Sequence, residues 1–252
     1  MSGQDALFEY LLRLGDNALI LGHRLSEWCG HGPALEEDLA LSNVALDLIG
    51  QTQLWLNLAG AVEGKGRDAD RLACHRDARD FRNVLLVEQP NGDFAVTMAR
   101  QFYFDAWHYL LLRELMGSKD GRIAEIAAKA LKEVTYHVER SREWVVRLGD
   151  GTEESHRRMQ AAVDDLWMYT GELFESDEVD QAVIGGGLGP APASLHEPWL
   201  GLMRATAEEA TLTLPQPGWA QRGGKRGIHS EHLGYILADL QFLQRAYPGA
   251  TW

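Results

Sequence analysis

The chain has 252 residues, 45% of them hydrophobic, so it is long enough to bury one substantial core. Its 37 acidic and 24 basic residues give a formal net charge of −13, which disfavours nucleic acid and anionic membrane surfaces as partners. The two cysteines, Cys29 and Cys74, lack metal-type spacing, and we expect them to be reduced, buried thiols.

The sequence shows no pattern typical of a signal peptide or of a membrane-spanning helix. Residues 1–12 have neither the basic region nor the apolar run of a signal peptide. No segment approaches the roughly 18 uninterrupted apolar residues of a membrane-spanning helix. We therefore expect a cytoplasmic protein.

Apolar residues recur at helical spacing along most of the chain, and no stretch alternates as a strand would, which predicts an all-α fold. The first helix should cover Gln4–Trp28, and the glycines that follow Cys29 should end it. A second helix should run from Pro33 to Val62, because Pro suits a first helical turn. Between the helix pairs we expect a polar turn over residues 63–70, a short basic helix over residues 71–82 and a turn over residues 88–93.

Two further long helices, over residues 93–116 and 122–148, should complete a four-helix bundle. Beyond them the pattern predicts helices over residues 153–175, 194–209 and 230–247, with a glycine-rich loop over residues 184–193. We expect a single domain over residues 1–252, with a core bundle over about 4–148 and a C-terminal helical extension over about 153–252.

The bundle helices carry an incomplete pattern of metal ligands. Bundles that hold two irons take a Glu-x-x-His pair from each of two helices and one carboxylate from each of the others. Leu48 and Gln51 stand where one such pair is expected, and Val134 and His137 stand where the other is expected. Without iron, the lost carboxylates would be buried charges with no counter-ion. The pattern therefore predicts a degenerate di-iron site and no metal in this chain.

Three other side chains could belong to such a site. Asp105 is a plausible remnant of a single carboxylate, and His108 follows it at i+3. These two could bind a metal, but a buried Asp paired with a histidine from the same or a neighbouring helix is the favoured interpretation. Asp16 lies at the expected depth on the first helix, although it could equally cap a bend after Gly15.

Long stretches of the sequence resemble a known family. They are LGDNALILGHRLSEWCGHGP, LALSNVALDLIGQ, LLVEQPNGDFAVTMARQFYFDAWHYLL and GGKRGIHSEHLGYILADLQFLQR. Together they resemble the C subunits of bacterial ring-1,2-phenylacetyl-CoA epoxidases over about residues 12–252. The resemblance implies a ferritin-like fold and a non-catalytic structural subunit that has no catalytic residue and no cofactor of its own.

The same resemblance implies partners in phenylacetate degradation. Iron is expected in a separate catalytic di-iron subunit, the A component of the epoxidase. This chain would brace that subunit within a hetero-oligomer that acts on phenylacetyl-CoA with a reductase. Two other functions remain possible at this stage: an active di-iron oxygenase in its own right, and a free-standing acyl-CoA-binding protein.

A basic segment offers a candidate contact for coenzyme A. Its members are Arg71, His75, Arg76, Arg79 and Arg82, and helical spacing would place three of them on one face. Arginine binds phosphates through bidentate hydrogen bonds, although the neighbouring acidic residues could equally pair with these side chains on a solvated helix. The resemblance implies substrate contacts at two groups of residues: Asp80, Phe81, Arg82 and Asn83, and Gln181, Ala182 and Val183. The basic segment adds Arg79 to the first group as a candidate contact.

Features nearer the C-terminus have plainer explanations. His229 and His232 could bind zinc, but a surface pair at a helix start is favoured because no suitable third ligand lies near. The glycine-rich segment from Arg222 to Gly227 lacks nucleotide-loop spacing and is interpreted as a partner contact or a plain loop. Trp199, Trp219 and Trp252 fall in or near irregular segments, which indicates coverage by another chain.

Overall fold

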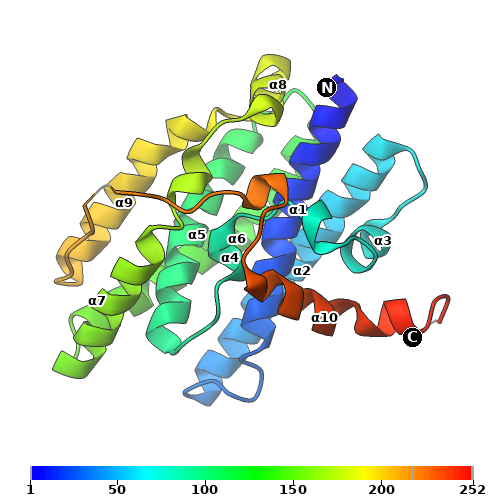
Figure 1. The fold of residues 1–252 in the computed structure, drawn as a ribbon. Coiled ribbons are helices and arrows are strands. Elements are labelled where there is room, and N and C mark those ends of the chain that lie inside the picture. Colours follow the sequence, from blue (N-terminus) through cyan, green and yellow to red (C-terminus); the bar gives the residue numbers. More distant parts are fainter. Residues whose placement is uncertain (1, 217, 251–252) are drawn as a thin grey trace. The chain divides into compact units, whose positions relative to one another are not determined.

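The computed structural model describes residues 2–216 and 218–250, and these residues form α-helices and short 3₁₀ helices without any strand. The all-α prediction is therefore confirmed. The chain forms two compact units (Figure 1): a terminal unit, made of the residues up to Pro90 and those from Arg222 onward, and a central unit, residues 91–221. Each unit contains one pair of long helices; the single-domain assignment stays a prediction.

The terminal unit is built on α1 (Gly3–Ser26) and α2 (Leu35–Glu63), which lie side by side (Figure 1). A capping box at Ser2 starts α1, and Gly64, in the left-handed conformation, ends α2. The two helices approach closely at Gly15, where a Cβ atom would press into the side chain of Leu56. Both helix predictions hold to within about two residues.

The predicted basic helix over residues 71–82 is wrong. The chain forms α3 (Ala69–Cys74), a 3₁₀ turn (Ala78–Asp80) and α4 (Leu85–Glu88) instead, so His75, Arg79 and Arg82 do not share a helix face. The burial expected for the thiols is also wrong, since Cys29 is exposed and Cys74 only partly buried. Helix α10 (Glu231–Ala246) completes the unit against α1, α3 and α4.

The central unit is built on α5 (Phe94–Leu115) and α6 (Gly121–Gly149), as predicted. Asp93 and Asp120 cap the two N-termini, where side-chain oxygens accept hydrogen bonds from backbone amides. Helix α7 (Glu153–Trp167) ends eight residues before its predicted end, because the 3₁₀ helix Gly171–Phe174 follows it. The unit then adds α8 (Glu178–Gly186), which was not predicted and whose last residues lie in the predicted loop, the 3₁₀ turn Pro192–Leu195, and α9 (His196–Glu209).

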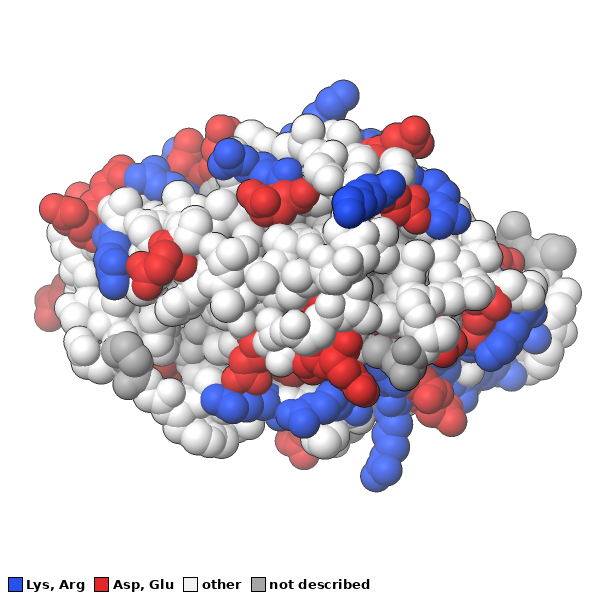
Figure 2. Space-filling model, turned by 90° about the horizontal axis from the view of Figure 1, so that it is seen from above, with Lys and Arg blue, Asp and Glu red and all other residues white. Residues whose placement is uncertain are grey.

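The exposed surface mixes charges of both signs. Figure 2 shows acidic and basic side chains next to one another on the face drawn, with uncharged surface between them. Over the described part of the chain, no helix combines the length and apolar character that crossing a membrane would require.

Candidate functional site

A buried polar cluster lies between α5 and α6 of the central unit. Asp105 is fully buried, and its Oδ1 accepts a hydrogen bond of 2.7 Å from Gln101 Nε2. Its Oδ2 accepts one of 2.9 Å from Ser141 Oγ. Each carboxylate oxygen of Asp105 therefore accepts one hydrogen bond, from Gln101 on α5 and from Ser141 on α6.

Burial shifts the protonation of this cluster. Removal from water raises the pKa of Asp105 to about 6, against the opposing charge of nearby His137 and the hydrogen bonds from Ser141 and Gln101. Burial also lowers the pKa of His108 to about 3, and the proximity of His137 adds to that shift. Burial therefore disfavours the charged form of both side chains: His108 is neutral at pH 7, whereas Asp105, with a pKa of about 6, is still mostly ionised there.

Asp105 also has a partner that the sequence did not indicate, Ser141. The histidine that interacts with Asp105 electrostatically is His137 on the neighbouring helix, while Ser141 on that helix supplies the hydrogen bond. Ser141 lies four residues after His137, so both face α5 from the same side of α6.

The degenerate ligand positions are all buried. Leu48 and Val134 are completely excluded from solvent and offer no atom that can bind a metal. Gln51 is buried on α2 of the terminal unit. Across the described residues, no three His, Cys, Asp or Glu side chains are grouped as a metal ion would require. Leu48 and Val134 thus cannot supply the negatively charged carboxylates that a pair of irons takes from several helices.

Asp16 has a different role from either of those considered for it. It is fully buried in the terminal unit and forms an ion pair with Arg76, whose Nη1 donates a hydrogen bond of 3.0 Å to Asp16 Oδ2. The same oxygen accepts a 2.8 Å hydrogen bond from the backbone amide of Arg82. Asp16 therefore fixes the segment that runs from Arg76 to Arg82 against α1.

The first group of predicted substrate contacts lies on that segment. Arg79 and Asp80 expose their side chains, whereas Phe81 and Asn83 are fully buried. Arg82 is partly buried, and its Nε donates a 2.7 Å hydrogen bond to Glu9 while its Nη1 donates to the backbone oxygens of Arg79 and Phe81. A side chain this heavily engaged holds the loop in shape, so Arg79 is the basic side chain of the group that faces solvent.

The glycine-rich segment closes over the same residues. A Cβ atom on Gly224 would collide with the backbone oxygen of Asn83, and one on Gly227 would collide with that of Arg79. Gly227 also has a φ of +76°, a conformation that favours glycine. This segment therefore contacts its own chain within the terminal unit.

The interpretation of His229 as part of a surface pair is wrong. Its side chain is 4% exposed, with Nδ1 2.9 Å from Glu88 Oε2 and Nε2 3.1 Å from the carbonyl oxygen of Phe81. Glu88 is fully buried and also accepts hydrogen bonds from the backbone amide of Ser230 at 2.6 Å and from Asn83 Nδ2 at 3.0 Å. Glu88 thus joins the start of α10 to the candidate contact segment.

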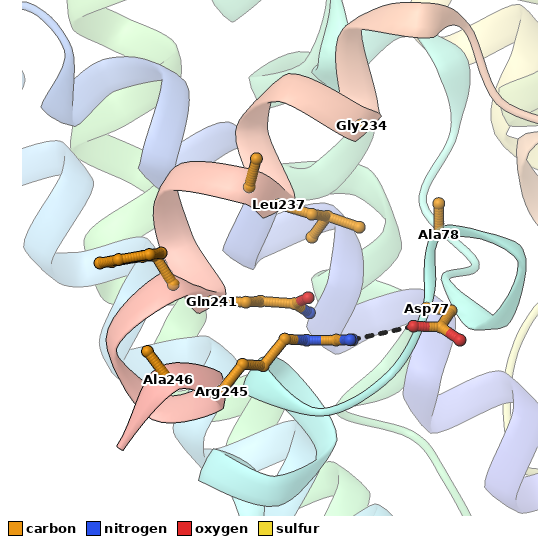
Figure 3. Close-up of a pocket in the computed structure, with 9 residues that line it drawn as sticks. Asp77, Ala78, Gly234, Leu237, Gln241, Arg245 and Ala246 are labelled. Carbon is orange, nitrogen blue, oxygen red and sulfur yellow. Dashed lines mark hydrogen bonds and ion pairs between the residues drawn. The ribbon is translucent and has the colours of Figure 1, made fainter. Parts of the chain in front are cut away.

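Helix α10 borders a shallow pocket beside this segment (Figure 3). The pocket encloses about 550 Å³, and Arg245 reaches across it from α10 to Asp77, with Nη2 3.0 Å from Oδ1. Gln241 Nε2 and Arg245 Nη2 donate to the backbone oxygen of Arg76. The segment that precedes Arg79 is therefore held on both sides, by α1 and by α10.

The second group of predicted contacts lies on α8 of the central unit. Gln181 and Ala182 are exposed, and Val183 is buried. Asp177 caps the helix by accepting hydrogen bonds from the amides of Val179 and Asp180. The two groups thus belong to different compact units, and their part in substrate binding stays a prediction.

Comparison with known proteins places the chain in a family. The family described as "Phenylacetic acid catabolic protein" matches residues 2–252. The chain is also 51% identical to the C subunit of the 1,2-phenylacetyl-CoA epoxidase of Escherichia coli (strain K12) over 248 residues, which cover 98% of this chain and 100% of that protein. With a match along essentially its whole length, the chain belongs to the phenylacetic acid catabolic protein family.

Proposed function

We propose that this chain is the non-catalytic structural subunit of a multicomponent phenylacetyl-CoA 1,2-epoxidase that serves aerobic phenylacetate degradation in the cytoplasm. The observation that carries the proposal is the 51% identity to an epoxidase C subunit over the full length of that relative. In this proposal the partner is the catalytic di-iron subunit, which holds the iron, and a separate reductase supplies electrons.

The chemistry of the degenerate positions supports a structural role. Leu48 and Val134 cannot bind a metal, and both oxygens of Asp105 already accept hydrogen bonds. The carboxylate of Asp105 is already shared with Gln101 and Ser141, and two irons would need further carboxylates from other helices. We infer that the helices were kept as a scaffold while the metal chemistry was lost.

An exposed apolar stripe supports the expectation of a partner. Four side chains of α2 lie on one helical face with a large part of each exposed: Leu35, Leu39, Leu46 and Ile49. Leu35 and Leu46 are 72% and 65% exposed. Such a row is costly in water, and a permanent interface with another protein would cover it.

The candidate contact with coenzyme A rests on Arg79. Its guanidinium lies on a segment fixed by Asp16 and by α10, and its side chain is exposed. A fixed arginine at the surface suits the phosphates of coenzyme A, which it can bind through charge-assisted hydrogen bonds. Asp80 beside it, and Gln181 and Ala182 on α8, are further exposed members of the proposed contact set.

Metal analysis of the purified chain tests the structural role. We expect no stoichiometric iron and no absorption from an oxo-bridged pair after expression in iron-replete medium. Two tightly bound irons per chain would instead establish a di-iron oxygenase in its own right. Calorimetry with phenylacetyl-CoA on the isolated chain separates the remaining alternative, because tight binding without a partner would indicate an acyl-CoA-binding protein.

Substitution of Arg79 tests the substrate contact. In the reconstituted complex, Arg79→Ala should raise the KM for phenylacetyl-CoA about tenfold, as expected for one charge-assisted phosphate contact, while assembly of the complex stays unchanged. Arg122→Ala is a matched control, because Arg122 is an exposed arginine of the central unit that pairs with Asp120 at its own helix start. Unchanged kinetics for Arg79→Ala would remove this residue from the contact set and leave the structural role intact.

A further inference from the structure

The central unit contains a second pocket, away from the buried polar cluster of α5 and α6. It encloses about 380 Å³, within the range of small-molecule sites. Five of its lining side chains carry rings, drawn from α7, the 3₁₀ helix Gly171–Phe174, α9 and the segment before Gln221: Trp167, Phe174, His196, Trp199 and Trp219. Aromatic lining this dense is suited to holding a flat ring.

The floor of the pocket is rigid. Trp199 is 1% exposed, and its Nε1 donates a 3.0 Å hydrogen bond to the backbone oxygen of Tyr103. Its ring centroid lies 5.5 Å from that of Trp167 and 5.2 Å from that of Phe174. The ring of His196 lies 4.8 Å from that of Phe174. These contacts hold the rings of the floor in fixed positions before any ligand binds.

One wall of the pocket exposes a large apolar ring to solvent. Trp219 lines the pocket, yet it is 72% exposed. The segment that carries it is anchored, because Gln221 donates its amide to the backbone oxygen of Met168 at 2.8 Å and Gly171 leaves room for Ala220. An indole held beside a pocket with most of its surface in water gains from a ligand that covers it.

The charged groups at the rim discriminate between ligands. Among the described lining residues, the ionisable ones are Arg204 and His196. The described lining contains no Asp or Glu. Arg204 forms its ion pair with Glu197 at 4.0 Å, and both side chains are largely exposed, so the guanidinium is only weakly engaged. In a chain with a net charge of −13, a lining without acidic residues favours an anion over a cation.

We propose that this pocket binds a planar aromatic ring that carries an anionic group, with the ring against the exposed Trp219 and the anion at Arg204. A free aryl carboxylate and an adenine nucleotide share this chemistry. The site lies wholly within the central unit and does not depend on the epoxidase role.

Ligand-observed NMR and calorimetry on the purified full-length chain test the proposal. The probes are phenylacetate, phenylacetamide, which has the same ring without the charge, and cyclohexylacetate, which has the same charge without a planar ring. Phenylacetate should bind at least about tenfold more tightly than either analogue. Adenosine 3′,5′-bisphosphate in a parallel titration distinguishes the two sources, since the tighter of the two ligands identifies the natural class.

Two variants assign the binding to this pocket. Trp219→Ala should weaken phenylacetate binding about tenfold, the scale of a lost stacking contact, and Trp144→Phe, a partly exposed ring of α6 outside the lining, should not. Arg204→Gln should abolish the preference for phenylacetate over phenylacetamide. Its control is Arg147→Gln, since Arg147 is as exposed as Arg204 and pairs with Glu143 on α6.

Three results would overturn the proposal. One is the absence of binding by both phenylacetate and the nucleotide at millimolar concentration. Another is equal binding of phenylacetate and cyclohexylacetate, which would exclude recognition of a flat ring. The third is binding that survives Trp219→Ala in a variant whose circular dichroism matches the parent chain, which would place the ligand elsewhere.

Discussion

Arg76 neutralises Asp16 inside the terminal unit, although the two residues are 60 positions apart in the chain. The side chains of both are almost completely buried. The guanidinium also lies 4.3 Å from the ring centroid of Phe81. A single cation therefore satisfies a buried carboxylate on α1 and covers a buried ring on the candidate contact segment.

Removal of that cation should destabilise the protein strongly. Arg76→Ala would leave the carboxylate of Asp16 buried with only the Arg82 amide as a donor, and loss of one partner of a buried ion pair costs about 3–5 kcal/mol. Urea unfolding would measure this change in the free energy of unfolding. Lys65→Ala is the control in the same unit. The Lys65 side chain is 74% exposed, and Glu63 keeps its second partner, Arg67, so the loss should cost less than about 1 kcal/mol. Similar values for the two variants would contradict the role given to Arg76.

Two groups on α5 should give the stability opposite dependences on pH. Asp105 has a folded pKa of about 6 against an ordinary 3.8, so the folded state takes up its proton first and stability rises as pH falls between these values. His108 has a folded pKa of about 3 against 6.5, so the unfolded state takes up its proton first and stability falls as pH drops below about 6.5. The two slopes, each about 1.4 kcal/mol per pH unit, should largely cancel between pH 4 and 6.

Variants separate these two contributions. Asp105→Asn should lose stability steeply below about pH 6.5, and His108→Gln should become more stable as the pH is lowered from about 6 to 4. Chemical denaturation at half-unit steps of pH, with the parent chain alongside, measures both curves. Parallel curves for the parent and Asp105→Asn would show that this carboxyl does not titrate near pH 6.

Closure of the glycine-rich segment should depend on Gly227. Gly227→Ala would force a side chain into the left-handed conformation and against the backbone oxygen of Arg79, at a cost of at least about 1 kcal/mol. It should also speed tryptic cleavage after Lys225 or Arg226. Gly234→Ala on α10 is the matched control, since a Cβ there meets nothing within 4 Å and should stabilise the helix by about 0.5–1 kcal/mol. Equal cleavage rates in the two variants would mean that Gly227 does not hold the segment closed.

The apolar stripe of α2 should be needed for assembly. Leu39→Glu and Leu46→Glu each place a charge in the middle of the stripe and should weaken binding to the proposed catalytic partner at least about tenfold, as a buried unpaired charge would. Co-purification and analytical ultracentrifugation measure the loss. Ala61→Glu adds the same charge at an exposed position of α2 beyond the stripe and should assemble normally. If the leucine variants assemble as well as this control, the interface lies elsewhere.

Helical periodicity was sufficient to predict the long helices but not the segment between α2 and α5. The ends of α1, α2, α5 and α6 follow local signals such as the caps at Asp93 and Asp120, which a sequence displays directly. Residues 71–82 have helical spacing as well, yet the helix ends at Cys74, and Arg76, just beyond that end, forms the ion pair with Asp16. A pair so distant in the chain leaves no local signal, so the basic face expected from the spacing does not form.

In the candidate site, too, the features that depend on residue type could be predicted, and those that depend on residues distant in the chain could not. The residue types alone show that the side chains of Leu48 and Val134 have no metal-binding atom. That these positions once held ligands stays a prediction. The burial of His229 against Glu88 could not be predicted, since it depends on the return of the chain 141 positions later. The aromatic pocket was missed for a related reason: Trp199, in or near an irregular segment, was expected to be covered by another chain, whereas it is buried on α9 within its own chain. Trp219 is exposed as expected, and Trp252 lies outside the described residues.

Asn83 is a local partner of the Glu88 carboxylate, but two further partners come from the last tenth of the polypeptide. His229 and Ser230, which contact Glu88, are synthesised after the whole central unit, which has its own core and lies between the two parts of the terminal unit along the chain. During translation the central unit can therefore fold while α1–α4 still lack α10. The terminal unit is thus the one that can be completed only after the last helix has been synthesised.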